Sequence, residues 1–144
     1  MIFSNGLDDK VRDGTKTQTR RLVKETDEIL DWTAKPWMTT TIFRNNRILW
    51  ETWQSEKTYA IQSGRGKKGN GRFRITKIRK ETLQSITEAD AKAEGVPKIV
   101  RTTSAWFRNE ATVSFQQLWN SIHKKPGDRW DSNPEVWVLE IEPV

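Results

Sequence analysis

The sequence predicts an α+β fold in which short strands form a barrel-like sheet and two or three short helices pack beside it. Segments of strand length recur along the chain and are separated by turns that contain glycine, proline or asparagine. Helical spacing appears in only a few short segments, and the regular strand–helix–strand order of a parallel sheet is absent. The 144 residues are expected to form a single domain, residues 1–144, with a core of its own.

Composition limits the chemistry that this chain can perform. Apolar residues make up only 34% of the sequence, but eight tryptophans and five phenylalanines supply large side chains for a compact core. Because there is no cysteine, disulfides, thiolate catalysis and cysteine-based zinc sites are excluded. The single histidine, His123, argues against a histidine metal site or a Ser-His-Asp triad. We therefore expect no metal and no cofactor.

The charge of the chain indicates an anionic partner. The formal net charge is +6, and the positive residues are clustered along the sequence. A small, basic, aromatic-rich domain is typical of nucleic-acid binding, although such charge also serves solubility alone. No apolar run reaches membrane-spanning length and the N-terminus has no hydrophobic signal segment, so we expect a cytoplasmic protein.

A short helical segment is predicted before Gly14. Leu7 and Val11 lie four residues apart and share one helical face, and Ser4 or Asn5 can cap its start. Gly14 ends the helix, because a left-handed backbone that closes a helix costs least at glycine. The next residues are therefore expected on a fixed turn rather than in a flexible loop.

The pattern then changes to that of a strand, in which threonines alternate with cationic and amide side chains. Lys16 and Thr19 are three residues apart, so they point to opposite faces of a regular strand. They converge only if the preceding turn or a β-bulge redirects Lys16. Such a convergence is the condition for any joint chemistry of the two side chains.

A lysine beside a hydroxyl can act as a base and a nucleophile. For this, the lysine pKa must fall by roughly three units from about 10.4, through burial or through neighbouring cations such as Arg20 and Arg21. The other interpretation is a solvated basic edge of Lys16, Arg20 and Arg21 that binds phosphate. Residue types alone favour this second interpretation.

Residues 25–47 are predicted to be a variable excursion, with one strand candidate at residues 39–43. Trp32 and Trp37 lie there, and we interpret them as a lid on the core in preference to a base-stacking platform. A short buried strand follows at residues 48–53 around Glu51. A carboxylate in such a strand needs a cationic partner near the Lys16 segment, so Glu51 is a candidate site residue, with an ordinary rim position as the alternative.

A strongly basic segment occupies residues 59–80, which contain eight cations and no acidic residue. Residues 63–71 are glycine-rich and are expected to form a turn whose cations either bind phosphate or only keep a hairpin tip soluble. A strand follows, along which cations can track a nucleic-acid backbone. The order of residues in a P-loop is absent. The candidates for nucleic-acid contact are Arg65, Lys67, Lys68, Arg72 and Arg74.

Two further helices are predicted in the second half of the chain. Thr87 and Asp90 have the spacing of a capping box, and Gly95 ends that helix, so Glu94 is its last residue. A carboxylate there faces the unfavourable end of the helix dipole and is stabilised only by a nearby cation. A plain surface position is the alternative, and residue types alone favour it.

The last helix is predicted to start at Ser114, after a polar loop or short helix at residues 98–113 that holds Trp106 and Phe107. We interpret His123, at its end, as a partner of the helix dipole rather than a catalyst. A final strand at residues 136–141 is expected to close the barrel. The core positions of the helix are Phe115, Leu118, Trp119 and Ile122.

The pattern Gly14-x-Lys16-x-x-Thr19-x-Arg21 resembles the signature of the ASCH domain family, a branch of the PUA-like superfamily. Its common form is Gly-x-Lys-x-x-Glu-x-Arg, and the threonine at position 19 is similar to a subset of small N4-acetylcytidine amidohydrolases. The resemblance continues in residues 49–53, 86–95 and 130–138 and so extends over nearly the whole chain. It implies a PUA-like mixed β pseudo-barrel with two or three short helices.

The resemblance also implies an activity and a site. Lys16, Thr19 and Glu94 fall at the catalytic positions of the amidohydrolase subset. The expected activity is a metal-independent removal of the acyl group from N4-acetylcytidine or related N4-acylated cytosine nucleosides. For substrate or oxyanion binding we assign Arg21, and for substrate binding also Arg20 and Glu51.

Two other functions stay open at this point. One is a non-catalytic RNA-binding ASCH module that uses the basic residues 59–80, and the other is RNA cleavage, an activity of an ASCH relative. The expected partner is thus an acylated cytidine nucleoside or RNA. A monomer is favoured.

Overall fold

The structure is a computed structural model that describes residues 1–31, 39–44, 51–96 and 110–144. Its helices and strands are, in chain order, α1 (Leu7–Arg12), β1 (Gln18–Leu22), β2 (Glu28–Asp31), β3 (Thr40–Phe43), β4 (Glu51–Gln54), β5 (Thr58–Ala60), β6 (Arg72–Thr82), α2 (Glu88–Ala93), α3 (Glu110–Ile122) and β7 (Glu135–Pro143). Short 3₁₀ helices are η1 (Leu83–Ser85), η2 (Pro126–Asp128) and η3 (Trp130–Ser132).

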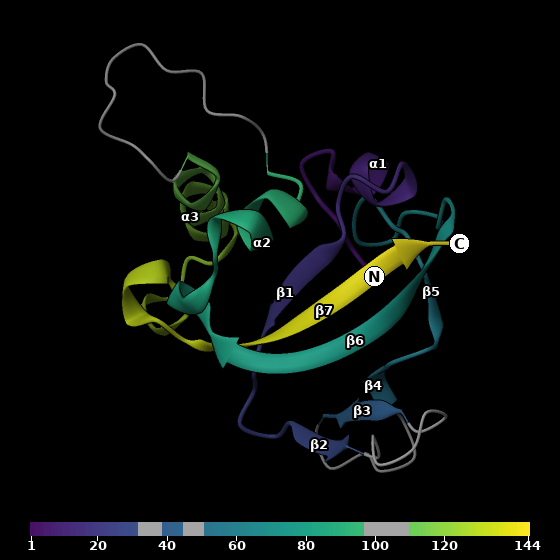
Figure 1. Cartoon of the computed structure of the whole chain (residues 1–144), viewed down its shortest axis with the longest axis horizontal. Helices are drawn as coiled ribbons and strands as arrows, with labels where there is room; N and C mark the ends of the chain where they lie inside the picture. The colour runs from purple at the N-terminus through teal and green to yellow at the C-terminus, as the bar shows by residue number, and fades with distance from the viewer. Residues whose placement is uncertain (32–38, 45–50, 97–109) are drawn as a thin grey trace.

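The main sheet has four antiparallel strands in the order β1-β7-β6-β5. The long strand β6 curves across the molecule beside β7 (Figure 1), and its register shifts between Ile75 and Lys77, as at a β-bulge that bends a strand. A smaller antiparallel sheet has the order β2-β3-β4. The predicted fold class is confirmed: the described residues form a mixed α+β fold with a curled half-barrel sheet and three helices.

Two apolar clusters pack against the main sheet, and β7 contributes to both. Trp137 and Leu139 belong to the cluster beside α1, whereas Val136 and Val138 belong to the cluster under α2 and α3. Successive side chains of a strand point to opposite faces, so both faces of β7 are covered. This explains why β7 is a nearly continuous apolar run rather than an alternating one.

Several local predictions are confirmed. The Thr87 hydroxyl accepts a hydrogen bond from the Asp90 backbone N–H at 3.1 Å, so Thr87 caps α2 as predicted. Glu94 is the C-cap residue of α2. The strand expected after the glycine-rich turn is β6, in which Phe73 and Ile75 are buried.

The predicted caps of the two other helices are wrong. The N-cap of α1 is Gly6, and no side chain caps this helix. Helix α3 begins four residues before Ser114, which is buried inside it. The reason is a cap from another helix: the Glu88 carboxylate of α2 accepts hydrogen bonds from the backbone N–H groups of Ala111 at 2.8 Å and Thr112 at 3.0 Å.

Two strand predictions are also corrected. Strand β7 is predicted to close the barrel, but it lies between β1 and β6, and in the described residues the sheet stays open, with β1 and β5 at its two edges. Strand β2 lies in the segment that the sequence predicts as a variable excursion; all four of its residues are exposed, so no apolar face marks it as a strand. The predictions for Trp32, Trp37, Trp106, Phe107 and residues 48–50 lie outside the described residues. None of the helices in the described ranges is long and apolar enough to cross a membrane.

We predict that Thr87→Ala lowers the free energy of unfolding by about 1 kcal/mol, because it removes the side-chain cap of α2. Chemical denaturation of the variant measures this loss. Thr87→Ser, which keeps the hydroxyl, should stay close to the wild type. Equal stability of Thr87→Ala and wild type would contradict the assigned role of the cap.

Candidate active site

Lys16 reaches the interior from the turn between α1 and β1. The Lys16 backbone N–H donates to the carbonyl of Lys10 at 2.9 Å, and the Thr17 N–H donates to the carbonyl of Ala93 at 2.8 Å. The first bond holds the turn to α1 and the second holds it against the end of α2, and β1 starts only at Gln18, three residues later than the strand pattern indicated. Because Lys16 precedes the strand, strand alternation does not apply to it, and the turn redirects its side chain.

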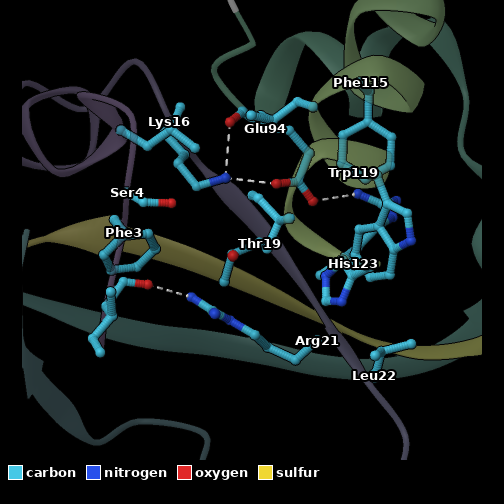
Figure 2. A pocket seen from close by; sticks show the side chains of 15 residues that line it. Phe3, Ser4, Lys16, Thr19, Arg21, Leu22, Glu94, Phe115, Trp119 and His123 are labelled. Carbon is cyan, nitrogen blue, oxygen red and sulfur yellow. Dashed lines mark hydrogen bonds and ion pairs between the residues drawn. The ribbon is translucent and has the colours of Figure 1, made fainter. Parts of the chain in front are cut away.

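The Lys16 side chain, only 2% exposed, ends on Glu94. Its ammonium donates to Glu94 Oε2 at 2.5 Å and to the Glu94 main-chain carbonyl at 2.8 Å (Figure 2). A carbonyl at a helix C-terminus lacks an intrahelical partner, and a cation there also interacts favourably with the helix dipole. Lys16 thus neutralises the buried carboxylate of Glu94 and also donates a hydrogen bond to a free carbonyl at the end of α2.

Burial dominates the electrostatics of Lys16. Loss of solvent lowers the pKa of its ammonium below the usual value of 10.5, and the nearby charges of Arg21 and Arg20 lower the pKa further. The ion pair and hydrogen bond with Glu94 act in the opposite direction but do not cancel the effect of burial. The neutral amine is therefore more accessible at Lys16 than at an exposed lysine.

Arg20 holds the other oxygen of Glu94. Its side chain is fully buried and donates to Glu94 Oε1 at 2.9 Å and to Glu81 Oε1 at 2.7 Å, and its guanidinium lies 3.4 Å from Asp90 Oδ2. Three carboxylates therefore occupy its terminal nitrogens. The sequence assigned Arg20 to substrate binding, but this geometry favours a role in positioning Glu94.

Thr19 lies next to this arrangement, at the wall of a cavity of about 200 Å³. Figure 2 shows Lys16 and Phe3 on one side of Thr19, with Trp119 and His123 on the other. Within the described part of the chain, the Thr19 hydroxyl has no hydrogen-bond partner, and no direct bond joins it to Lys16. The structure thus brings Lys16, Thr19 and Glu94 to one cavity.

Arg21 lines the same cavity from β1. Its guanidinium donates to the carbonyl of Ile2 at 2.8 Å and lies 5.5 Å from the centre of the Phe3 ring. Its Nε is buried and has no partner among the described residues. Arg21 is thus a cation on the wall of the cavity that Thr19 also lines.

The aromatic wall of the cavity is not evident from the sequence. Phe115, Trp119 and His123 line it, whereas helical spacing placed the first two in the core and His123 at a helix end. Phe115 and Trp119 are indeed buried, as predicted, but Ile122, which is also predicted to lie in the core, is 47% exposed. Helical spacing shows which residues of α3 share a face, but it does not show that this face lines a cavity.

The remaining predicted residues lie elsewhere. Glu51 is in β4, which belongs to the smaller sheet rather than to the sheet of β1; its side chain lies outside the described structure, so its role stays a prediction. Arg72 donates to Thr58, and Arg74 pairs with Glu142. The exposed side chains of the glycine-rich turn have no ion-pair partner among the described residues; these are Arg65, Lys67 and Lys68.

Comparison with known proteins gives a likeness of fold. No family model matches the sequence, and no curated protein matches it. The structure is similar to the crystal structure of an ASCH domain from Lactobacillus crispatus JV V101, with 15% sequence identity and a TM-score of 0.48. The match covers 94% of this chain and 69% of that chain. A likeness at this identity concerns the fold alone.

We predict that Gly95→Ala destabilises the protein by at least about 1 kcal/mol more than Gly66→Ala. Both glycines have φ of +72°, so alanine is strained at each, but only at Gly95 would the new Cβ also lie 3.0 Å from Lys16 Cβ. Nothing lies within 4 Å of the corresponding position at Gly66. Denaturation of both variants measures the difference, and equal losses would show that Gly95 does not pack against Lys16 closely.

Proposed function

We propose that this protein is an amidohydrolase that removes the acyl group from N4-acetylcytidine or a related N4-acylated cytosine nucleoside. The observation that carries the proposal is the buried Lys16–Glu94 pair in one cavity with the Thr19 hydroxyl, which has no hydrogen-bond partner among the described residues. A buried amine, a hydroxyl and a carboxylate are the groups that acyl transfer needs. The residue pattern at positions 14–21, which resembles that of the amidohydrolase subset, supports the same assignment.

The reaction starts with the neutral form of Lys16, which burial makes accessible. Lys16 accepts the Thr19 proton while the Thr19 oxygen attacks the acyl carbonyl carbon, and the carbonyl oxygen becomes an oxyanion. The carbon–nitrogen bond then breaks, and the proton on Lys16 passes to the leaving amine. Water hydrolyses the resulting Thr19 ester, which releases the carboxylic acid and restores the hydroxyl.

Glu94 and the two arginines support these steps. Glu94 orients the amine of Lys16 through Oε2, while Arg20 holds Oε1 and so keeps the carboxylate in place. Arg21 stabilises the oxyanion or binds the substrate carbonyl, because it is a cation that lines the same cavity as Thr19. No hydrogen bond yet joins Lys16 and Thr19, and catalytic bonds of this kind often tighten only when substrate is present.

A second candidate is RNA binding without catalysis. It is favoured by Arg65, Lys67 and Lys68, which are exposed and have no ion-pair partner among the described residues. The strand cations support it less, because Arg72 and Arg74 are already engaged by Thr58 and Glu142. Turnover of a free nucleoside separates the two candidates, since a binding module releases no product.

We predict that Lys16→Met, Thr19→Val and Glu94→Gln each lower kcat/KM for N4-acetylcytidine at least about a hundredfold, because each removes a group that moves or directs a proton or attacks the carbonyl. Release of cytidine, measured by chromatography, gives the rate. Lys68→Met is the matched control, since it removes the same charge from an exposed loop and should leave the rate unchanged. A wild type no faster than buffer would end the enzyme proposal, and full activity of Thr19→Val would remove the nucleophile.

We also predict that kcat/KM rises with pH until Lys16 is neutral. The pKa of Lys16 is lowered in the folded protein, so the rise should level off below 10.5, the value for an exposed lysine. The reason for the sign is that only the deprotonated amine can accept the Thr19 proton. A pH–rate profile tests this, and a rate that is constant from acidic to alkaline pH would contradict the assignment of Lys16 as the base.

A further inference from the structure

The wall of the cavity opposite Lys16 is built from two stacked rings. The imidazole of His123 lies on the indole of Trp119, with ring centroids 3.9 Å apart and an angle of 28° between the planes. The indole N–H of Trp119 donates to the Asp128 carbonyl at 2.8 Å, which fixes the indole. The backbone N–H of His123 donates to the Trp119 carbonyl at 2.8 Å, so His123 continues the last turn of α3. The indole is therefore held in place before any ligand arrives, and the imidazole stacks on it.

The imidazole of His123 has unused hydrogen-bonding capacity. Within the described residues, neither ring nitrogen has a hydrogen-bond partner, and the half-buried side chain lines the cavity. A neutral imidazole presents one donor and one acceptor. On the opposite side, Lys16 and Glu94 form an ion pair with each other. His123 is thus the group in the aromatic wall that can recognise the polar edge of a flat ring.

We propose that His123 is the residue that binds the pyrimidine ring of the substrate, and that Trp119 positions its imidazole for this contact. The inference rests on the proposed function, because the ring in question is that of the acylated cytosine. The ring then lies at the aromatic wall while the acyl group points to Thr19. The proton chemistry stays with Lys16 and Glu94, so His123 determines affinity and not the chemical step.

The surroundings of His123 keep its imidazole neutral near neutral pH. Burial lowers the pKa of the ring, and the positive charges of Arg21 on β1 and Lys24 after β1 lower it further, whereas Asp128 of η2 acts in the opposite direction. Protonation at acidic pH removes the acceptor nitrogen and adds a charge beside Arg21. Ligand binding should therefore weaken as the pH falls through the pKa of His123.

The test measures the binding of cytidine, which has no acyl bond to cleave, by isothermal titration calorimetry. In His123→Phe, a flat ring still covers Trp119 but offers no nitrogen, and we expect cytidine to bind roughly tenfold more weakly. His123→Gln, which keeps a donor and an acceptor, should recover part of the affinity. The loss of affinity of the wild type at acidic pH should disappear in both variants. Gln117→Ala, on an exposed position of α3, is the matched control and should bind as the wild type does.

The outcomes separate this inference from the proposed function. Cytidine binding that depends on His123, in a protein that hydrolyses no N4-acetylcytidine, supports the ring site and removes the enzyme proposal. Hydrolysis of N4-acetylcytidine with the same KM in wild type and His123→Phe removes the ring site and keeps the enzyme. A wild type that binds no cytidine overturns the ring site, as does equal affinity of wild type and His123→Phe. If His123→Phe unfolds, the same decision rests on the pH dependence of binding by His123→Gln.

Discussion

The buried contact between the Lys16 ammonium and the Glu94 carboxylate is the interaction on which the site depends. Removing two charges from water costs several kcal/mol per ion, so such a pair persists only where further hydrogen bonds complete it. Here the Glu94 main-chain carbonyl and the Arg20 guanidinium supply those bonds. The contact also explains why the turn before β1 and the end of α2 lie against each other. The turn provides the Lys16 ammonium, and the end of α2 provides the carboxylate and the free carbonyl that this ammonium binds.

This contact is anchored in the sheet through a chain of charges. Arg20 reaches Asp90 on α2 and Glu81 on β6, and Arg79 of β6 reaches Asp90 and pairs with Glu140 of β7 at 2.6 Å. Ion pairs with β1 and β6 therefore hold α2 in its position. This network fixes the Glu94 carboxylate more firmly than an ion pair with Lys16 alone would. A catalytic carboxylate requires such preorganisation.

In strand β6, positive residues that are clustered in the sequence lie beside carboxylates of another strand in the structure. Residues 59–80 contain no acidic residue, which suggested a continuous cationic surface. In the sheet, however, Arg74 faces Glu142 across the strand pair, Arg79 pairs with Glu140, and Lys80 lies 3.6 Å from Glu135. Cross-strand pairing with β7 thus neutralises three of the cations of β6. Among the described residues, Arg72 and Lys77 of β6 and the cations of the glycine-rich turn have no ion-pair partner.

The sequence by itself determined the fold class, the cap and end of α2, the apolar positions of β6, and the residues that could perform chemistry, because these follow from local periodicity and side-chain type. Only the tertiary structure decided that Lys16 meets Glu94, 78 residues further along the chain, and that Trp119 and His123 face the same cavity. It also decided that residues before Ser114 belong to α3, because Glu88 of another helix accepts hydrogen bonds from the backbone N–H groups of Ala111 and Thr112. Contacts between distant segments depend on how the sheet curls and which helix covers it, and no pattern within a short stretch of sequence specifies that geometry.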